Sequence, residues 1–79
     1  MREPKTAVEI RTELARLIHE GIDARGKVNN TDVGFVLRHP AHDSNGCNWY
    51  ISYLTNAADH MMDVGAAVVS VKKRWNLAE

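Results

Sequence analysis

Apolar and polar positions in residues 6–22 recur at the spacing of an α-helix. At about 100° per residue, one side of that helix collects the apolar residues and a glycine: Ala7, Ile10, Leu14, Leu17, Ile18 and Gly21. Thr6 and Glu9 have the spacing of a capping box, which satisfies two backbone N–H groups at a helix start. The pattern predicts an amphipathic helix over residues 6–22, preceded by a tail at residues 1–5.

Two later segments alternate with the period of two residues that is typical of strands. In residues 33–38, one face would carry Val33, Phe35 and Leu37, and the other Gly34, Val36 and Arg38. In residues 47–54, one face would carry Trp49, Ile51 and Tyr53, and the other Tyr50, Ser52 and Leu54. Pro40 ends ladder bonding after the first strand, and the sequence DSNG at residues 43–46 favours a turn. We expect a β-hairpin with a long connection.

The last segment, residues 56–75, again has helical spacing. Its apolar stripe is Ala57, Met61, Val64, Val68, Val71 and Trp75. Asn56 is a favourable N-cap residue, and the basic sequence KKR near the end suits the helix dipole. The β-branched residues of VGAAVVSV leave a strand over residues 66–71 as the alternative. The caps and the length of the period favour a helix over residues 56–75.

The order helix, strand, strand, helix predicts a single α+β domain over residues 1–79. In this αββα arrangement, the two amphipathic helices would cover one face of the antiparallel hairpin, because apolar stripes must be buried against another element. The largest side chain of the hairpin, Trp49, is expected to fill the core against Leu14, Phe35 and Val68. A chain of 79 residues has room for one core only.

Charge and cysteine content narrow the classes of function. Ten basic and ten acidic residues give a net charge of zero, so the positive surface of a nucleic-acid-binding protein is not expected. The segment Lys72–Trp75, with Lys73 and Arg74 between, leaves weak nucleic-acid binding as an alternative. One cysteine is typical of a reducing compartment, and no apolar run approaches the ~20 residues of a membrane span. With no secretion signal at the N-terminus, we expect a cytoplasmic protein that does not bind membranes.

A polar cluster lies in the hairpin connection. His39, His42 and Cys47, with His60 near the last helix, could supply four zinc ligands, or Cys47 could act as a nucleophile beside a histidine base. A metal-dependent hydrolase using His39, His42 and Cys47 is therefore one hypothesis. The spacing matches no established ligand pattern, and free cysteine is usually buried. The sequence favours loop histidines and a structural cysteine, with no metal, cofactor or catalytic residue.

Two short motifs, GCNW at residues 46–49 and RWNL at residues 74–77, carry a resemblance. Residues 46–77 resemble small uncharacterised bacterial proteins in which Gly-Cys-Asn-Trp and an Arg-aromatic-Asn-Leu ending recur. The resemblance implies a bacterial source and no particular activity. It also implies that Gly46, Cys47, Asn48 and Trp49 form one structural unit. Gly46 would permit the turn, Asn48 would bond loop backbone, and Trp49 would fill the core.

The shortage of strands suggests a function. A lone hairpin is marginal in water, and its two edges can recruit another chain. The face away from the helices would carry Val36, Tyr50 and Leu54, which is more apolar than a solvated face requires. We therefore expect a non-catalytic structural or protein-interaction module that forms a homodimer, its two hairpins joined edge to edge. The alternative is a monomer in which residues 27–31 add a third strand.

Overall fold

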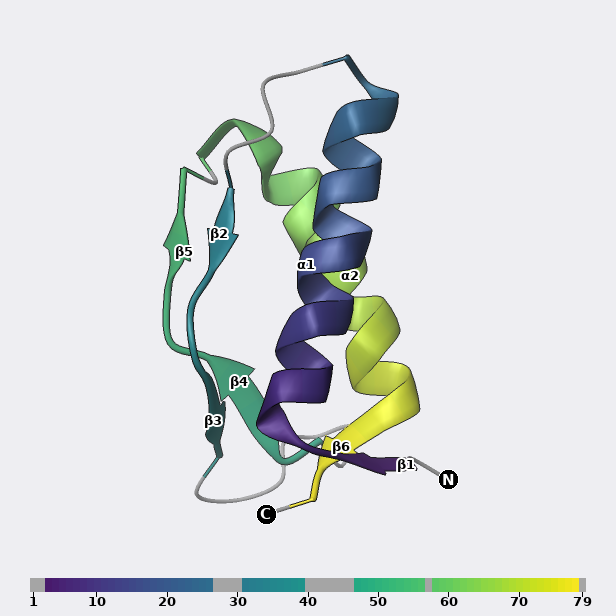
Figure 1. Cartoon of the computed structure of the whole chain (residues 1–79), viewed down its shortest axis with the longest axis vertical. Coiled ribbons are helices and arrows are strands. Elements are labelled where there is room, and N and C mark those ends of the chain that lie inside the picture. The colour runs from purple at the N-terminus through teal and green to yellow at the C-terminus, as the bar shows by residue number, and fades with distance from the viewer. Residues whose placement is uncertain (1–2, 27–30, 40–46, 57, 79) are drawn as a thin grey trace.

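The computed structural model of the chain describes residues 3–26, 31–39, 47–56 and 58–78. Two helices lie beside a long two-stranded ribbon, and short strands from the two ends of the chain meet below the helices (Figure 1). The elements in order are β1 (Glu3–Lys5), α1 (Ala7–Ala24), β2 (Asp32–Val33), β3 (Val36–Arg38), β4 (Trp49–Ile51), β5 (Leu54–Thr55), the short 3-10 helix η1 (Ala58–His60), α2 (Met61–Arg74) and β6 (Trp75–Leu77). The α+β class predicted from the sequence is confirmed. The order is richer than helix, strand, strand, helix, because strands also precede α1 and follow α2.

Helix α1 forms as its pattern predicts. The Thr6 hydroxyl accepts the Glu9 N–H at 3.2 Å, and the Glu9 carboxylate accepts the Thr6 N–H at 3.0 Å, which confirms the capping box. The helix continues two residues beyond the predicted end, to Ala24, and Gly26 follows with a positive φ of 68°. Its fully buried side chains are spaced by four residues: Ile10, Leu14, Ile18 and Ile22.

The two predicted strands, residues 33–38 and 47–54, are each interrupted in the middle. β2 pairs with β5 and β3 pairs with β4, both antiparallel. Two residues separate the paired segments on each strand, so the ribbon keeps one register without a bulge. The middle is still bonded, because the Gly34 N–H donates to Tyr53 O at 3.0 Å and the Ser52 N–H to Phe35 O at 2.9 Å. The hairpin is therefore one continuous ribbon.

Beyond this interruption, the prediction of which ribbon residues face the core is wrong. Val33 and Val36 are both buried, whereas Phe35 is 64% exposed. The opposite strand changes in the same place, with Tyr53 exposed and Leu54 half-buried against the core. Gly34 allows the change, since a Cβ there would lie only 2.7 Å from the Tyr53 ring.

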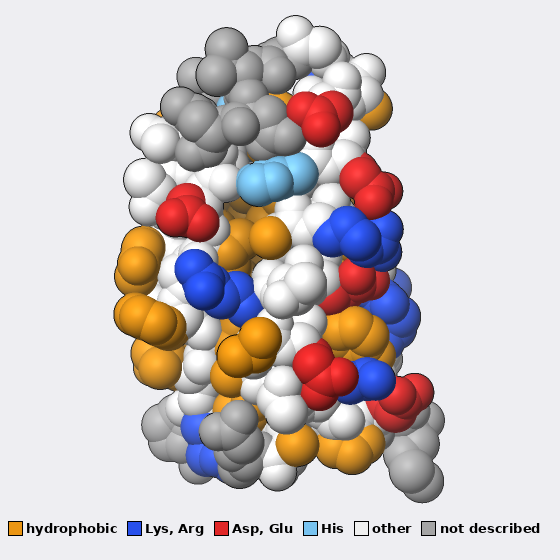
Figure 2. Space-filling model, viewed as in Figure 1, with side chains coloured by type: hydrophobic (Ala, Val, Ile, Leu, Met, Phe, Trp, Pro, Cys, Tyr) orange, Lys and Arg blue, Asp and Glu red, His pale blue; other side chains and the backbone are white. Residues whose placement is uncertain are grey.

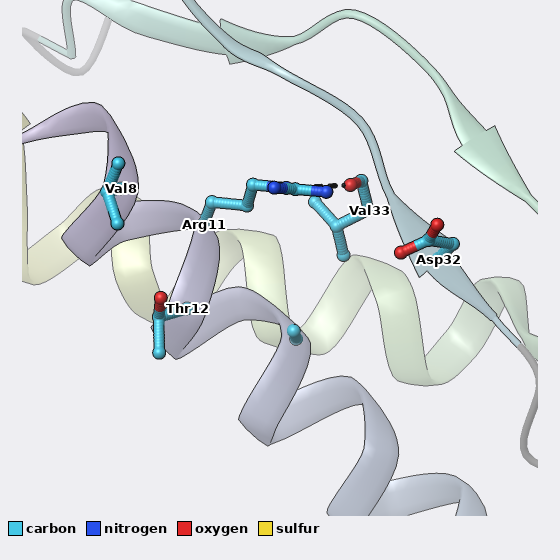
Figure 3. A pocket seen from close by; sticks show the side chains of 6 residues that line it. Val8, Arg11, Thr12, Asp32 and Val33 are labelled. Atoms are coloured by element: carbon cyan, nitrogen blue, oxygen red, sulfur yellow. Dashed lines mark hydrogen bonds between the residues drawn. The ribbon is translucent and has the colours of Figure 1, made fainter.

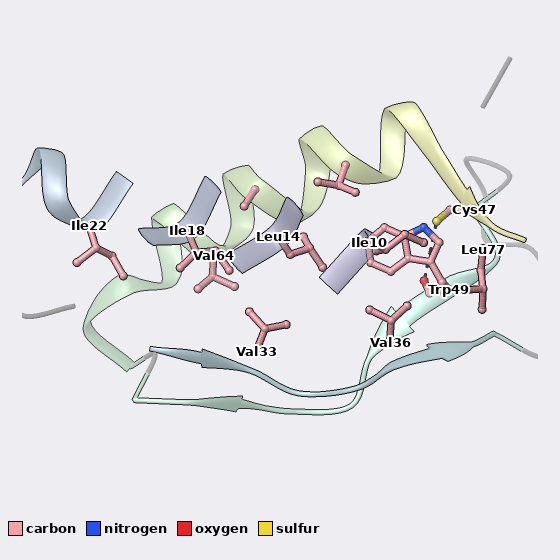
Figure 4. Packing of buried hydrophobic residues seen from close by; sticks show 12 residues of the cluster. Ile10, Leu14, Ile18, Ile22, Val33, Val36, Cys47, Trp49, Val64 and Leu77 are labelled. Carbon is pink, nitrogen blue, oxygen red and sulfur yellow. Dashed lines mark hydrogen bonds between the residues drawn. The ribbon is translucent and has the colours of Figure 1, made fainter. Parts of the chain in front are cut away.

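The core lies between the helices and the ribbon (Figure 4). Trp49 is fully buried, as predicted, at the end of the core that also holds Cys47 and Leu77. Leu14 and Val68 belong to the same cluster. The expected contact of Phe35 with Trp49 is wrong, because the Phe35 ring lies outside the core and instead meets Tyr53 edge to face at 6.4 Å.

Helix α2 is shorter than the predicted helix over residues 56–75. Asn56 is not its N-cap: it has a positive φ of 57°, whereas an N-cap residue is extended, and its carbonyl accepts the Thr31 hydroxyl at 3.1 Å. The helix is capped by His60 without a side-chain hydrogen bond. At the other end Trp75 is extended and begins β6. The alternative strand over residues 66–71 is wrong, because the buried positions Val64, Ala67 and Val71 keep the helical period.

The two ends of the chain pair in a parallel sheet that the sequence did not predict. β1 aligns Glu3 with Trp75 and Lys5 with Leu77, and the Ala78 N–H donates to Lys5 O at 2.8 Å. The predicted tail at residues 1–5 is thus a strand from Glu3 onward. A third hairpin strand at residues 27–31 is not formed by Thr31, the one described residue of that segment; residues 27–30 lie outside the described residues.

One carboxylate links the two helices. Glu13 on α1 accepts hydrogen bonds from Arg16 at 2.7 Å and from Arg74 on α2 at 3.1 Å. Its side chain is only 14% exposed. The bond from Arg16, with a further contribution from Arg74, lowers the pKa of Glu13 from its ordinary 4.5 to about 2. The ionised form of Glu13 therefore stabilises the packing of α1 on α2.

We expect the Glu13 contacts to make stability acid-dependent. Because the pKa of Glu13 is lower in the folded state, its contribution is complete above pH 4.5 and is lost as the pH falls toward about 2. The contribution is about 1–2 kcal/mol once solvent screening of the half-exposed Arg16 is included. Urea unfolding across this pH range should show a smaller loss of stability for Glu13→Gln than for the parent. Glu20→Gln, which removes an exposed partner of Arg16, is the control and should keep the parent's slope; equal slopes for the parent and Glu13→Gln would contradict the prediction.

Candidate functional site

The described residues of the GCNW motif and the last strand form one buried hydrogen-bonded unit. The Asn48 amide donates to Leu77 O at 2.9 Å and accepts the Leu77 N–H at 2.7 Å. The Trp49 indole N–H donates to Trp75 O at 3.0 Å. An asparagine amide offers the same donor and acceptor as a peptide group, so Asn48 takes the place of a neighbouring strand for β6. The bond of Asn48 to loop backbone stays a prediction, because residues 40–46, Gly46 among them, lie outside the described residues.

Cys47 belongs to the core rather than to an accessible site. It is 1% exposed, and its thiol lies 3.9 Å from Trp49 O as a weak donor. The His39 N–H donates to Asn48 O at 2.8 Å, and the His39 ring packs edge to face on Tyr50 at 5.8 Å. His42 lies outside the described residues. A nucleophile must be accessible to its substrate, whereas the described residues around Cys47 bury its thiol.

His60 does not join the other predicted ligands. It ends η1 beside β5, whereas His39 and Cys47 lie at the opposite end of the ribbon (Figure 1). The described residues therefore do not bring His60 together with His39 and Cys47 as candidate ligands. In the part of the chain that the structure describes, no three His, Cys, Asp or Glu side chains are placed to hold a metal ion. His60 is 7% exposed, and its Nδ1 has no hydrogen-bond partner among the described residues.

The basic segment Lys72–Trp75 makes contacts within the molecule. Lys72 Nζ lies 5.3 Å from the centre of the Trp49 ring. The Arg74 guanidinium binds Glu13 and also lies 5.0 Å from the centre of the Trp75 ring, on which Lys5 packs as well at 5.2 Å. These cations stabilise the junction of α2 with the terminal strands, so two of the three basic residues are already engaged.

The side of the ribbon away from the helices is apolar and exposed. Four residues form this outer ribbon face: Phe35 (64% exposed), Leu37 (40%), Tyr50 (40%) and Tyr53 (54%). Hydrophobic side chains gather along the edge of the molecule where the ribbon runs (Figure 2). The sequence predicted Val36, Tyr50 and Leu54 for this face, and only Tyr50 is there. The change of face at Gly34 turns Val36 and Leu54 inward and Phe35 and Tyr53 outward.

A pocket of about 250 Å³ opens between α1 and β2 (Figure 3). Its lining residues are Val8, Arg11, Thr12, Ala15, Asp32 and Val33. Arg11 reaches from the helix to the strand, and its Nε donates to Val33 O at 3.0 Å. Arg11 is not among the candidate residues predicted from the sequence, although its position gives a signal: it stands four residues after Ala7 and three before Leu14, on the apolar side of the helix. A charged residue on the apolar side of a helix indicates a polar contact with the element packed against that side.

Comparison of this chain with protein-family models, with curated proteins and with solved structures gave no match. Among the helices that the structure describes, none combines the length and the apolar composition needed to cross a membrane.

The Asn48 contacts predict a large loss of stability on truncation. Asn48→Ala leaves the Leu77 N–H and C=O without partners at a buried position, which should cost about 2–4 kcal/mol. Urea unfolding measures the loss, and hydrogen exchange should show faster exchange at the Leu77 and Ala78 amides. Ser52→Ala is the control, because it removes a comparable bond at an exposed position and should cost less than about 1 kcal/mol. Equal losses in the two variants would rule out a special role for Asn48.

Proposed function

We propose that this chain is a small, non-catalytic protein-interaction module that pairs with a second copy of itself through the outer ribbon face. The observation that carries the proposal is the exposure of four large apolar side chains on one side of the ribbon: Phe35, Leu37, Tyr50 and Tyr53. Contiguous exposed apolar surface on a small protein is typical of an interaction site. The proposal replaces the predicted edge-to-edge hairpin pairing with pairing face to face.

The chemistry of the face favours a like surface as partner. All four side chains are uncharged, and three are aromatic, which makes them suited to packing and to edge-to-face ring contacts. A partner selected by charge would meet no complementary group in these four residues. A two-fold axis that lies between the two copies, in the plane of the interface, brings the same apolar patch of each copy together, which is the simplest closed arrangement.

The size of the face sets the strength of the pairing. The exposed parts of these four side chains amount to roughly 400 Å² per copy, about half of what each partner buries in a standard specific interface. Within the described residues, each strand of the ribbon pairs with one other strand, so further strand contacts at the edges could add to this area. We expect a reversible dimer with micromolar affinity rather than an obligate one.

The proposal places the module in the cytoplasm of a bacterium. A single cysteine that packs in the core as a thiol suits a reducing compartment, which supports the location. The bacterial source rests on the GCNW and RWNL motifs, whose described residues form one unit through Asn48 and Leu77.

Sedimentation tests the pairing directly. The parent should change from a species of 8.9 kDa at low micromolar concentration to one of about twice that mass at high concentration. Phe35→Asp places a charge in the centre of the proposed interface without entering the core, and it should stay monomeric with an unchanged circular dichroism spectrum.

The matched control is Met62→Asp, which puts the same charge on an exposed apolar residue of α2, 76% exposed. This variant should dimerise like the parent. A parent that remains monomeric at every concentration would refute the proposal. So would loss of the dimer in Met62→Asp with its retention in Phe35→Asp, since that result would move the interface to the helix.

A further inference from the structure

The pocket between α1 and β2 is lined by Arg11. A hydrogen bond holds its guanidinium in place, but it forms no ion pair with a carboxylate among the described residues. Among the described arginines, Arg16, Arg25 and Arg74 form ion pairs with carboxylates. Arg11 instead donates its Nε to the Val33 carbonyl, a neutral acceptor, at 3.0 Å. This bond fixes the plane of the guanidinium across the gap between helix and strand (Figure 3). The two terminal nitrogens of a guanidinium fixed in this way are suited to binding a carboxylate by two parallel hydrogen bonds.

Asp32 supplies the opposite charge at the same pocket. It stands next to Val33 on β2 and lines the pocket with Arg11 (Figure 3). The two side chains do not form an ion pair with each other within the described residues, where such pairs reach to 4.0 Å. One positive and one negative group therefore line a single pocket without cancelling each other. A ligand with both charges would satisfy both groups.

The rest of the lining is apolar apart from one hydroxyl. Val8, Thr12 and Ala15 follow the helical spacing that places them on the same face of α1 as Arg11. Val8 is 73% exposed, so an apolar group resting on it would remove hydrophobic surface from water. The volume of about 250 Å³ is below the range of drug-sized sites and suits a molecule of amino-acid size.

We propose that this pocket binds a free aliphatic α-amino acid. The ligand carboxylate pairs with the terminal nitrogens of Arg11, and its ammonium group lies toward Asp32. Its side chain covers Val8 and Ala15. Asp32 repels anions that lack an ammonium group, and Arg11 repels amines that lack a carboxylate, so the pair of charges selects the zwitterion. The proposal stands apart from the dimer, since its residues are not those of the outer ribbon face.

Nuclear magnetic resonance titration with L-valine tests the proposal on the intact chain. Valine should produce saturable shifts at the Arg11 Nε–H and at the Asp32 and Val33 amides, with the millimolar affinity expected of so small a ligand. N-acetyl-L-valine lacks the ammonium group and L-valinamide lacks the carboxylate, and each should bind about ten-fold more weakly or worse. Valine shifts that do not saturate would overturn the proposal. Equal binding of N-acetyl-L-valine would overturn it too, because the pocket would then be a plain anion site.

Variants assign the two charges. Arg11→Gln and Asp32→Asn should each weaken valine binding about ten-fold, and Asp32→Asn should also remove the preference for valine over its N-acetyl form. Arg38→Gln is the matched control: it removes an exposed arginine of β3 that does not line the pocket, and it should leave valine binding unchanged. Circular dichroism confirms that each variant is folded. Full valine binding by folded Arg11→Gln would overturn the assignment.

Discussion

The paired hydrogen bonds between the Asn48 amide and the Leu77 backbone determine the arrangement of one whole end of this protein. They connect residues 29 positions apart and are buried, so water cannot replace them at low cost. Asn48 fixes the position of β6, and β6 then pairs with β1. The Trp49 indole N–H donates to Trp75 O in the same strand. A strand of three residues would gain little from β1 alone. The side-chain amide therefore makes the terminal sheet possible.

The ribbon depends on a different constraint, the missing side chain at Gly34. The Tyr53 ring occupies the space where a Cβ would stand, and the chain changes face between Val33 and Val36. Both valines can then face the core, although an odd spacing would place them on opposite sides of a regular strand. The same change turns Phe35 and Tyr53 toward solvent. The exposed aromatic surface is thus a consequence of how the ribbon fills its core.

Local patterns predicted the parts of the fold that depend on neighbours in sequence. The capping box of Thr6 and Glu9 and the buried series from Ile10 to Ile18 follow from spacing alone. The faces of the ribbon do not follow from spacing, because a prediction from alternating residues assumes a regular pleat and Gly34 interrupts that pleat. The terminal strands do not either, since Trp75 continues the helical period and becomes extended where its carbonyl accepts the Trp49 indole N–H and β6 pairs with β1. Arg11 was missed for a similar reason: its partner, Val33 O, is 22 residues away.

Charged contacts stabilise the interior junctions of this protein, whereas the exposed outer ribbon face is apolar and is available to a partner. Glu13, Arg74 and Lys72 are engaged where α1, α2 and the terminal strands meet, so the electrostatic attraction there acts within the chain. The outer ribbon face has no such charges and can gain stability only by removing apolar surface from water. Arg11 and Asp32 are the exception, because they line one pocket without forming a pair. Two opposite charges that line one pocket without pairing with each other suit the proposed ligand, which is neutral overall and charged at both ends.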